Sequence, residues 1–438
     1  MRKIWGLLCS LIISQAIAQE YNASQMDSLL YLLDINDKFM GSVIVVHDGE
    51  ILYEKAIGHA EMARQTKATT KTKYRVGSIT KMFTATLVLM AQEEGKLTLD
   101  QQLADFYPQV KNAQKISLKQ LLNHRSGIFN FTNSPTYLKW NTKGKTKTEL
   151  LKTIVSGGSV FDPGSKTEYS NSNFVLLTFI LEDVFQKPYA ELLQEKIIGP
   201  LGITNTYVGG DITIANNECH SYRYHKKWIK AEETDMSTPL GAGALVSTPS
   251  DLTTFITALF AGKLITHENL KAMLPPEKGF GFGMMTFPYS TKKGYGHGGG
   301  IDGFTSFLGY IPNDNLAFAV TSNGSNFTNN EIYVALLHSY YGKDYQMPTF
   351  DEISLSRSAL KAFVGNYESE QIPIKIKVYI KKGQLYAQGT GQSEIPLTAT
   401  GKSRFRFDRA GLVMSFDPNT HAMELRQGGG IFQYVRKK

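Results

Sequence analysis

Residues 75–95 read RVGSITKMFTATLVLMAQEEG, a stretch that joins a candidate reactive pair to a candidate buried helix. Residues 82–95 are apolar on most faces and end at Gly95, a pattern typical of a buried helix that stops at a glycine. Ser78 and Lys81 precede this run, and residues three positions apart lie on one face of a helix. We therefore expect a helix that begins at about Ser78 and carries both side chains on one face.

Ser78 and Lys81 have the chemistry of a nucleophile and its base. A serine hydroxyl is a weak nucleophile unless a base lies within hydrogen-bond reach. Lysine serves as that base only when neutral, and burial lowers its pKa because it disfavours the charged form. The helix N-terminus also offers the serine an N–H group for an oxyanion. The alternative is a serine that only caps a helix, and the same spacing recurs at Ser290/Lys293 and Ser358/Lys361.

A second stretch, FDPGSKTEYSNSNF (161–174), places Tyr169-Ser170-Asn171 after a Pro-Gly turn and before an apolar helix. A tyrosine hydroxyl can pass a proton between a nucleophile and a leaving group. An asparagine amide can hold the lysine and a substrate carbonyl in register. The alternative is a loop tyrosine beside an asparagine that caps the next helix.

A third stretch, GYGHGGGIDGFTSFLGY (294–310), contains His297-Gly298-Gly299-Gly300 within a strand-like run. Glycines in a strand indicate close approach by another backbone or by a ligand. A glycine-rich hairpin without a functional role is the alternative.

The order of the patterns predicts two domains after an N-terminal leader. Two β-rich runs flank Asp48-Gly49, which indicates a tight hairpin. Helical patterns occupy most of 97–262, and strands return after residue 279. This order predicts an α/β (α+β) domain over 19–345, an antiparallel sheet flanked by helices with an all-helical insertion. Short strands separated by turns predict a small all-β, barrel-like domain over 352–438.

The first residues, MRKIWGLLCSLIISQAIAQE, have a basic start, a short apolar run and the cleavage-like Ala16-Ile17-Ala18. This pattern predicts a secretory signal peptide over 1–18, with an uncleaved anchor as the alternative. We therefore expect a periplasmic or secreted protein with no stable membrane span after cleavage. Cys219 is then the only cysteine, so no intrachain disulfide is expected.

Composition and motifs limit the kinds of partner and cofactor that we expect for this protein. The net charge of +8 is spread along the chain without a basic block, so nucleic acid is not an expected partner. Metal-ligand spacings, phosphate loops and dinucleotide fingerprints are missing from the sequence, so no cofactor and no metal are expected. The expected partner is a small-molecule or peptide substrate. The sequence leaves the oligomeric state open.

Taken in order, the three stretches resemble the serine β-lactamase and penicillin-binding-protein superfamily, whose S-x-x-K signature they share. The class C-like branch, with its DD-peptidases, D-amino-acid peptidases and esterases, has the closest pattern. Further resemblance lies in ISLKQLLNHRSGI (116–128), IIGPLGITNTYV (197–208) and GAGALVSTPSDL (241–252). The resemblance covers about 35 to 340. The C-terminal domain weakly resembles the lipocalin-like domains of some of these hydrolases.

The resemblance implies catalytic roles for four residues. Ser78 matches the nucleophile that becomes acylated, and Lys81 matches the base that takes its proton. Tyr169 matches the residue that protonates the leaving group and helps to activate the deacylating water. Asn171 matches the amide of the Y-x-N position. By contrast, we interpret His124 as a structural residue, since histidine is often part of a packed interior.

The triplet His297-Gly298-Gly299 departs from the family pattern, which is often K-T-G or H-T-G. The resemblance makes the N–H groups of Ser78 and Gly300 the oxyanion hole and Gly298 and Gly299 part of the substrate-binding strand. Histidine is largely neutral near pH 7, and glycine has no hydroxyl, so a carboxylate anchor is weakened. Esters, amides or peptides held by other contacts suit such a site, and His297 could instead hydrogen-bond to Tyr169.

Several readings of the function remain open at this point. The three matched groups favour an exported serine hydrolase that works through an acyl-enzyme over a non-catalytic penicillin-binding sensor of the same fold. Peptidase, esterase and β-lactamase activities are not separated by the sequence. Two arginines of the central region, Arg125 and Arg223, are candidates to replace the missing carboxylate anchor.

Overall fold

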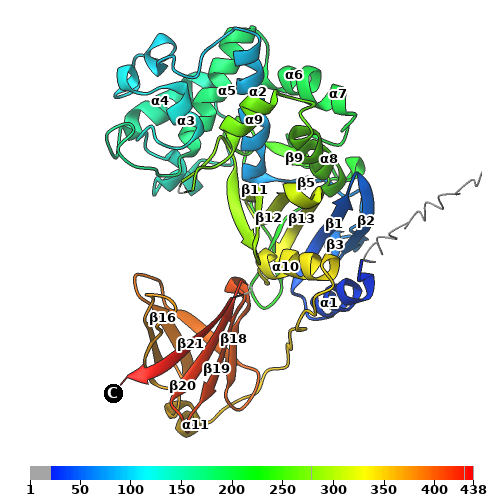
Figure 1. Cartoon of the computed structure of the whole chain (residues 1–438), viewed down its shortest axis with the longest axis vertical. Coiled ribbons are helices and arrows are strands. Elements are labelled where there is room, and N and C mark those ends of the chain that lie inside the picture. Colours follow the sequence, from blue (N-terminus) through cyan, green and yellow to red (C-terminus); the bar gives the residue numbers. More distant parts are fainter. Residues whose placement is uncertain (1–20, 278, 429, 438) are drawn as a thin grey trace, which may run out of the picture.

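The computed structural model describes residues 21–277, 279–428 and 430–437, and the predicted signal peptide lies outside them. Its centre is a six-stranded antiparallel sheet in the order β10-β11-β12-β13-β1-β2 (Figure 1). The strands are β1 (Phe39–His47), β2 (Glu50–Ile57), β10 (Met285–Tyr289), β11 (Lys292–Ile301), β12 (Phe304–Ile311) and β13 (Leu316–Ser325). The first two strands and the last four are thus far apart in sequence, and β1 pairs with β13 to join them.

Alternation along the central strands sends side chains to two separate cores. In β1, Val43 and Val45 pack with α1 (Ala23–Ile35) and α10 (Asn329–Tyr340) on one face. Ile44 and Val46 point to the other face, which is covered by α8 (Pro249–Phe260) and the helical region. The turn between β1 and β2 is the predicted Asp48-Gly49 hairpin, and both residues have positive φ, as a type I′ turn requires.

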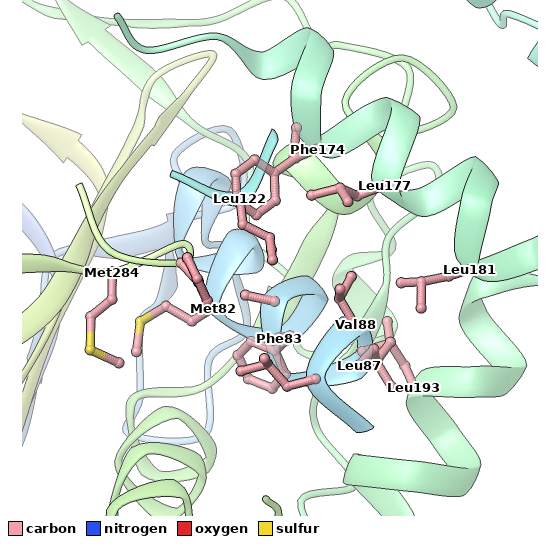
Figure 2. Packing of buried hydrophobic residues seen from close by; sticks show 14 of the residues in the cluster. Met82, Phe83, Leu87, Val88, Leu122, Phe174, Leu177, Leu181, Leu193 and Met284 are labelled. Atoms are coloured by element: carbon pink, nitrogen blue, oxygen red, sulfur yellow. The ribbon is translucent and has the colours of Figure 1, made fainter. Parts of the chain in front are cut away.

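The helical region surrounds α2 (Thr80–Glu93), which is buried on almost every face. Figure 2 shows Phe83, Leu87 and Val88 of this helix against leucines of its neighbours. The neighbouring helices are α3 (Leu118–Leu122), α4 (Lys147–Gly157), α5 (Asn171–Phe185), α6 (Tyr189–Leu193), α7 (Gly199–Leu201) and α9 (His267–Met273). The predicted insertion of helices between the two parts of the sheet is therefore confirmed.

Small sheets link the helical region to the central sheet. One contains β5 (Tyr74–Arg75), β9 (Leu245–Ser247) and β6 (Tyr207–Val208), and β3 (His59–Glu61) pairs with β4 (Thr66–Lys67). The hairpin of β7 (Tyr222–Tyr224) and β8 (Trp228–Lys230) stands beside the turn between β11 and β12, because Ser221 Oγ accepts a hydrogen bond from Gly303 N at 3.1 Å.

The C-terminal part is a closed eight-stranded barrel, preceded by α11 (Arg357–Lys361) (Figure 1). Apolar side chains such as Tyr367, Phe405 and Phe416 fill its interior. This architecture confirms a small all-β domain at the C-terminal end, whereas the limits 19–345 and 352–438 stay predictions. Its strands are β14 (Gly365–Glu368), β15 (Ile376–Lys381), β16 (Gln384–Gly389), β17 (Ile395–Ala399), β18 (Arg404–Phe407), β19 (Leu412–Asp417), β20 (Ala422–Gln427) and β21 (Gly430–Lys437).

The loop between β18 and β19 joins the barrel to the hydrolase part of the chain. Lys38 Nζ and Asp408 Oδ2 form a largely buried ion pair at 2.8 Å. Next to it, Arg409 donates a hydrogen bond to the backbone oxygen of Tyr224, 3.2 Å away, in the β7–β8 hairpin. Across the described ranges, from residue 21 to 437, no helix combines the length and the apolar character needed to cross a bilayer.

A buried ion pair fixes the turn that follows β11. Arg75 Nη1 lies 3.0 Å from Asp302 Oδ2, and the two side chains are only 3% and 2% exposed. The other carboxylate oxygen of Asp302 accepts hydrogen bonds from the backbone N and the hydroxyl of Thr234. Arg75 also donates to the carbonyl oxygen of Gly210. The turn is therefore tied to three separate segments of the chain.

We predict that Asp302→Asn destabilises the protein by about 3–5 kcal/mol, because it leaves the Arg75 charge buried without a counter-charge. Chemical denaturation measures this loss. The control is Glu168→Gln, which breaks an exposed pair with Lys166 (2.9 Å) and should cost about 1 kcal/mol or less. Equal losses in the two variants would contradict the prediction.

Candidate active site

Ser78 opens into a cleft of about 450 Å³ between the end of β11 and the helical region. The cleft is bounded by Gly77 and Ser78 on one side and by Gly300, Ile301 and Asp302 on the other. The remainder of its wall is contributed by Phe131, Thr132, Tyr137, Leu138, Asn141, Asn171, Arg223, His225, Ile229, Lys230, Ala231, Glu232, Thr234, Pro239, Ala242 and Gly243.

The nucleophile candidate lies in a 3₁₀ turn, η1 (Gly77–Ile79), rather than inside the long helix. The predicted helix start at Ser78 is thus two residues early, because Gly77 has φ +53° and Thr80 Oγ1 bonds back to the Gly77 carbonyl. A methyl group on Gly77 would lie 2.7 Å from Gly300 N, so the two backbones nearly touch. This contact places the N–H groups of Ser78 and Gly300 at the same edge of the cleft, as an oxyanion hole requires.

The glycines of the triplet differ in the space around them. A methyl group on Gly299 would stand 1.9 Å from the carbonyl oxygen of Val76, which already accepts a hydrogen bond from Ser306 Oγ. Gly299 is therefore required for β11 to pack against the turn that carries Ser78. A methyl group on Gly298 would meet nothing closer than 3.7 Å. Both glycines border a hollow beside the cleft of Ser78.

Lys81 is fully buried, and burial lowers its pKa well below the ordinary 10.5, which favours the neutral amine. Its Nζ lies 2.6 Å from the carbonyl oxygen of Ala242, 2.8 Å from Asn171 Oδ1 and 3.0 Å from Ser78 Oγ. A neutral amine has two N–H bonds and one lone pair. The two carbonyl oxygens can only accept, so they take both N–H bonds, and the lone pair faces the Ser78 hydroxyl.

Tyr169 completes a line of proton donors and acceptors. Its hydroxyl donates to Ser78 Oγ at 2.8 Å. Burial raises the pKa of Tyr169 above its usual value, and the hydrogen bond to Ser78 opposes that rise only in part, so the phenol stays protonated. A proton can thus pass from Ser78 to Lys81 during attack, while Tyr169 gives its own to a departing group.

Two hydrogen bonds fix the orientation of the Asn171 amide. Its Nδ2 donates to Thr132 Oγ1 at 3.0 Å and to Asn130 Oδ1 at 3.3 Å, which leaves Oδ1 for Lys81. The same Asn130 oxygen accepts from the backbone N of Asn171 at the start of α5. Sequence reasoning named Asn171 but missed Asn130 and the carbonyl of Ala242. Ala242 lies in the stretch 241–252, whose resemblance to the family was the only available signal.

One alternative from the sequence was a hydrogen bond between His297 and Tyr169, and the structure does not contain it. The Tyr169 hydroxyl is taken by Ser78, the two rings stand 6.2 Å apart, and His297 Nδ1 bonds to the Gly298 carbonyl. Burial lowers the pKa of His297 to about 4, so it is neutral at pH 7. His124, interpreted as structural, packs against the Tyr169 ring at 4.4 Å and accepts from Ser170 N. It therefore positions the tyrosine.

The two arginines proposed as carboxylate anchors are placed differently. Arg125 is not among the residues that line the cleft, and its Nη2 donates to the carbonyl of Gly164. Arg223 lines the cleft. In the residues that the structure describes, no group of three or more histidine, cysteine or acidic side chains is arranged to hold a metal ion.

Comparison with known proteins places this geometry in a family. A sequence profile described as Beta-lactamase matches residues 36–338, well over half of the chain. The chain belongs to this family. The fold and the hydrolase relatives together identify it as a serine hydrolase of the β-lactamase and penicillin-binding-protein superfamily.

Three similar proteins illustrate the range of the family. Penicillin-binding protein 4* of Bacillus subtilis is 24% identical over 94% of this chain and 98% of its own. Teichoic acid D-alanine hydrolase of Staphylococcus aureus is 27% identical over 56% of this chain and 62% of its own. The crystal structure of D-amino acid amidase from Ochrobactrum anthropi, complexed with D-phenylalanine, has a TM-score of 0.65 and 26% identity, and the match covers 73% of this chain and 99% of the amidase.

We predict that the stability of the wild type relative to Lys81→Met rises as the pH increases from the lowered folded-state pKa of Lys81 towards about pH 10, near the usual pKa of lysine. The folded-state pKa of Lys81 is lowered, so within this range the unfolded chain binds one more proton than the folded chain. Raising the pH removes that proton and favours folding by up to about 1.4 kcal/mol per pH unit. Denaturant unfolding at several pH values measures the difference. A pH-independent difference would mean that Lys81 is charged in the folded protein.

Proposed function

We propose that this protein is an exported serine hydrolase that forms an acyl-enzyme on Ser78 and cleaves small D-amino-acyl amides, peptides or esters. The observation that carries the proposal is the hydrogen-bond arrangement of Lys81. Both of its N–H bonds are engaged by Ala242 and Asn171, so its lone pair is aimed at the Ser78 hydroxyl. A binding protein without turnover would not need a base in this state.

Acylation and deacylation use the same groups in opposite order. Lys81 accepts the Ser78 proton as Oγ attacks the substrate carbonyl, and the N–H groups of Ser78 and Gly300 hold the oxyanion. Each such donor is typically worth about 3–4 kcal/mol of transition-state stabilisation. The proton of Tyr169 goes to the leaving group. Lys81 then returns a proton to Tyr169, which restores both groups. Water attacks the acyl carbonyl and gives one proton to this relay, and the relay passes a proton to Ser78 Oγ as the bond to the acyl group breaks.

The choice of substrate class is supported by the relatives and by the triplet. Two relatives, a teichoic acid D-alanine hydrolase and a D-amino acid amidase, are named for D-amino acid chemistry. His297 is neutral and Gly298 has no side chain, so a carboxylate on the leaving group finds little support there. The N-terminal sequence pattern supports export.

We predict that Ser78→Ala abolishes both covalent labelling by a fluorophosphonate probe and turnover of p-nitrophenyl acetate. Loss of a nucleophile typically removes several orders of magnitude in kcat. Ser358→Ala is the matched control, because Ser358 has the same spacing to Lys361 but is exposed on α11 of the C-terminal part. Residual activity above about a tenth of wild type would rule out Ser78 as the nucleophile. A wild type that is labelled but never turns over would favour the sensor alternative.

We also predict that the wild type hydrolyses p-nitrophenyl acetate with a higher kcat/KM than nitrocefin, and that Gly298→Thr narrows the gap. A β-lactam needs donors for its carboxylate, and charge-assisted hydrogen bonds are worth about 1.5–3 kcal/mol each. The space at Gly298 accepts a larger residue without backbone collision. Steady-state kinetics on both substrates measures the ratio. Faster hydrolysis of nitrocefin by the wild type would defeat the argument from the triplet.

A further inference from the structure

The leaving-group side and the acyl side of the cleft can be told apart along β11. Tyr169, the proton donor to the leaving group, lies beside His297, with ring centroids 6.2 Å apart. The oxyanion position is at Gly300, three residues further along the strand. The acyl part of a substrate therefore extends in the opposite direction from His297, past Ile301 toward Asp302. The open volume of the cleft lies on this side, because Gly300, Ile301 and Asp302 line it.

Arg223 stands at the far end of that acyl side. Its Nη2 donates to the backbone oxygen of Asp302 at 2.9 Å, and the residue is exposed to the cleft. Asp302 is two residues beyond Gly300, in the turn that follows β11, so it lies at most about 7 Å from Gly300. A guanidinium has five N–H donors in a planar fork, and one bond to a carbonyl leaves most of them available.

The carboxylates near Arg223 do not neutralise it. The side chain of Asp302 is committed to Arg75 and Thr234, behind the cleft wall. Among the described residues, no acidic oxygen lies within 4.0 Å of Arg223, whereas the neighbouring Lys230 is paired with Glu233. Glu232 is the remaining acidic residue of the lining. An exposed glutamate competes weakly for a cation that is already fixed in place.

The backbone around Arg223 is rigid enough to hold a ligand group. Arg223 pairs with Ile229 in the β7–β8 hairpin. A methyl group on Gly303 would lie 2.8 Å from the backbone oxygen of Tyr222, so the hairpin is in direct contact with the turn after β11. Arg409 of the barrel bonds to the carbonyl of Tyr224 from the other side. Fixing the backbone in advance reduces the ordering cost of binding.

We propose that Arg223 binds an anionic group on the acyl part of the substrate, about two residue lengths from the scissile carbonyl. This inference rests on the proposed function and specifies its substrate class: amides or esters with a carboxylate-bearing acyl group and an uncharged leaving group. The exposed apolar side chains of Leu138 and Ile229 also line the cleft, and Ile229 is the strand partner of Arg223, so apolar surface is available to the chain that links the two groups.

Three D-alanyl p-nitroanilides with a common leaving group test the proposal. N-succinyl-D-alanyl p-nitroanilide has a carboxylate six bonds, roughly 7 Å, from the scissile carbonyl carbon. N-butyryl-D-alanyl p-nitroanilide replaces that carboxylate with a methyl group, and D-alanyl p-nitroanilide presents an ammonium group instead. We expect the wild type to favour the succinyl over the butyryl substrate by about 10–100-fold in kcat/KM, mainly through KM.

Variants of the hairpin separate a specific contact from general attraction. Arg223→Ala should reduce the succinyl preference to about onefold, mainly by raising KM for the succinyl substrate, whereas Arg223→Lys should retain part of the preference. Lys227→Ala is the matched control, because Lys227 is an exposed cation of the same hairpin outside the cleft lining. This control should keep the full preference.

The outcomes distinguish the two proposals. Turnover of the three substrates without a succinyl preference, a preference for D-alanyl p-nitroanilide, or an unchanged preference in Arg223→Ala would each overturn the role of Arg223 while the hydrolase function stands. Equal losses in Arg223→Ala and Lys227→Ala would reduce the effect to long-range attraction and also overturn it. No turnover of any of the three substrates would overturn the proposed amide and peptide hydrolysis, and this inference with it.

Discussion

The close approach of two backbones, the turn at Gly77 and the strand at Gly299 and Gly300, is the constraint on which the rest of the site depends. It needs a positive φ at Gly77 and the absence of a Cβ at Gly299. The long helix α2 continues directly from that turn. The burial of α2 in the helical region therefore fixes the orientation of the turn that carries Ser78. Sheet and helices therefore meet at the nucleophile.

The second constraint is electrostatic and concerns the protonation states of the buried groups around Ser78. Burial lowers the pKa of Lys81 and of His297, and it raises the pKa of Tyr169, which stays protonated. The groups around the nucleophile therefore exchange protons without a fixed counter-charge. The charged residues of the cleft stand further out, around Arg223 and Asp302. The groups around the nucleophile and the charged residues of the cleft are thus separated in space.

Local sequence patterns predicted the elements and the residues whose types carry chemistry. The Asp48-Gly49 turn, the buried helix after Ser78 and the closing all-β part follow from short-range preferences and periodicity. The carbonyl of Ala242 could not be found in this way, because every residue has one and only the tertiary fold aims it at Lys81. The packing of His124 against Tyr169 also depends on segments that are distant in sequence.

The closure of the barrel also determines which parts of its sequence can change. Every strand from β14 to β21 has a partner on both sides, so the barrel offers no edge for strand addition. Its contact with the hydrolase part includes the short loop at 408–411, outside the hydrogen-bonded ladder. Loops of this kind accept changes of length and sequence at little cost to the strands they connect. The contact between the barrel and the β7–β8 hairpin can therefore change in sequence while the strands of both parts keep their pairing.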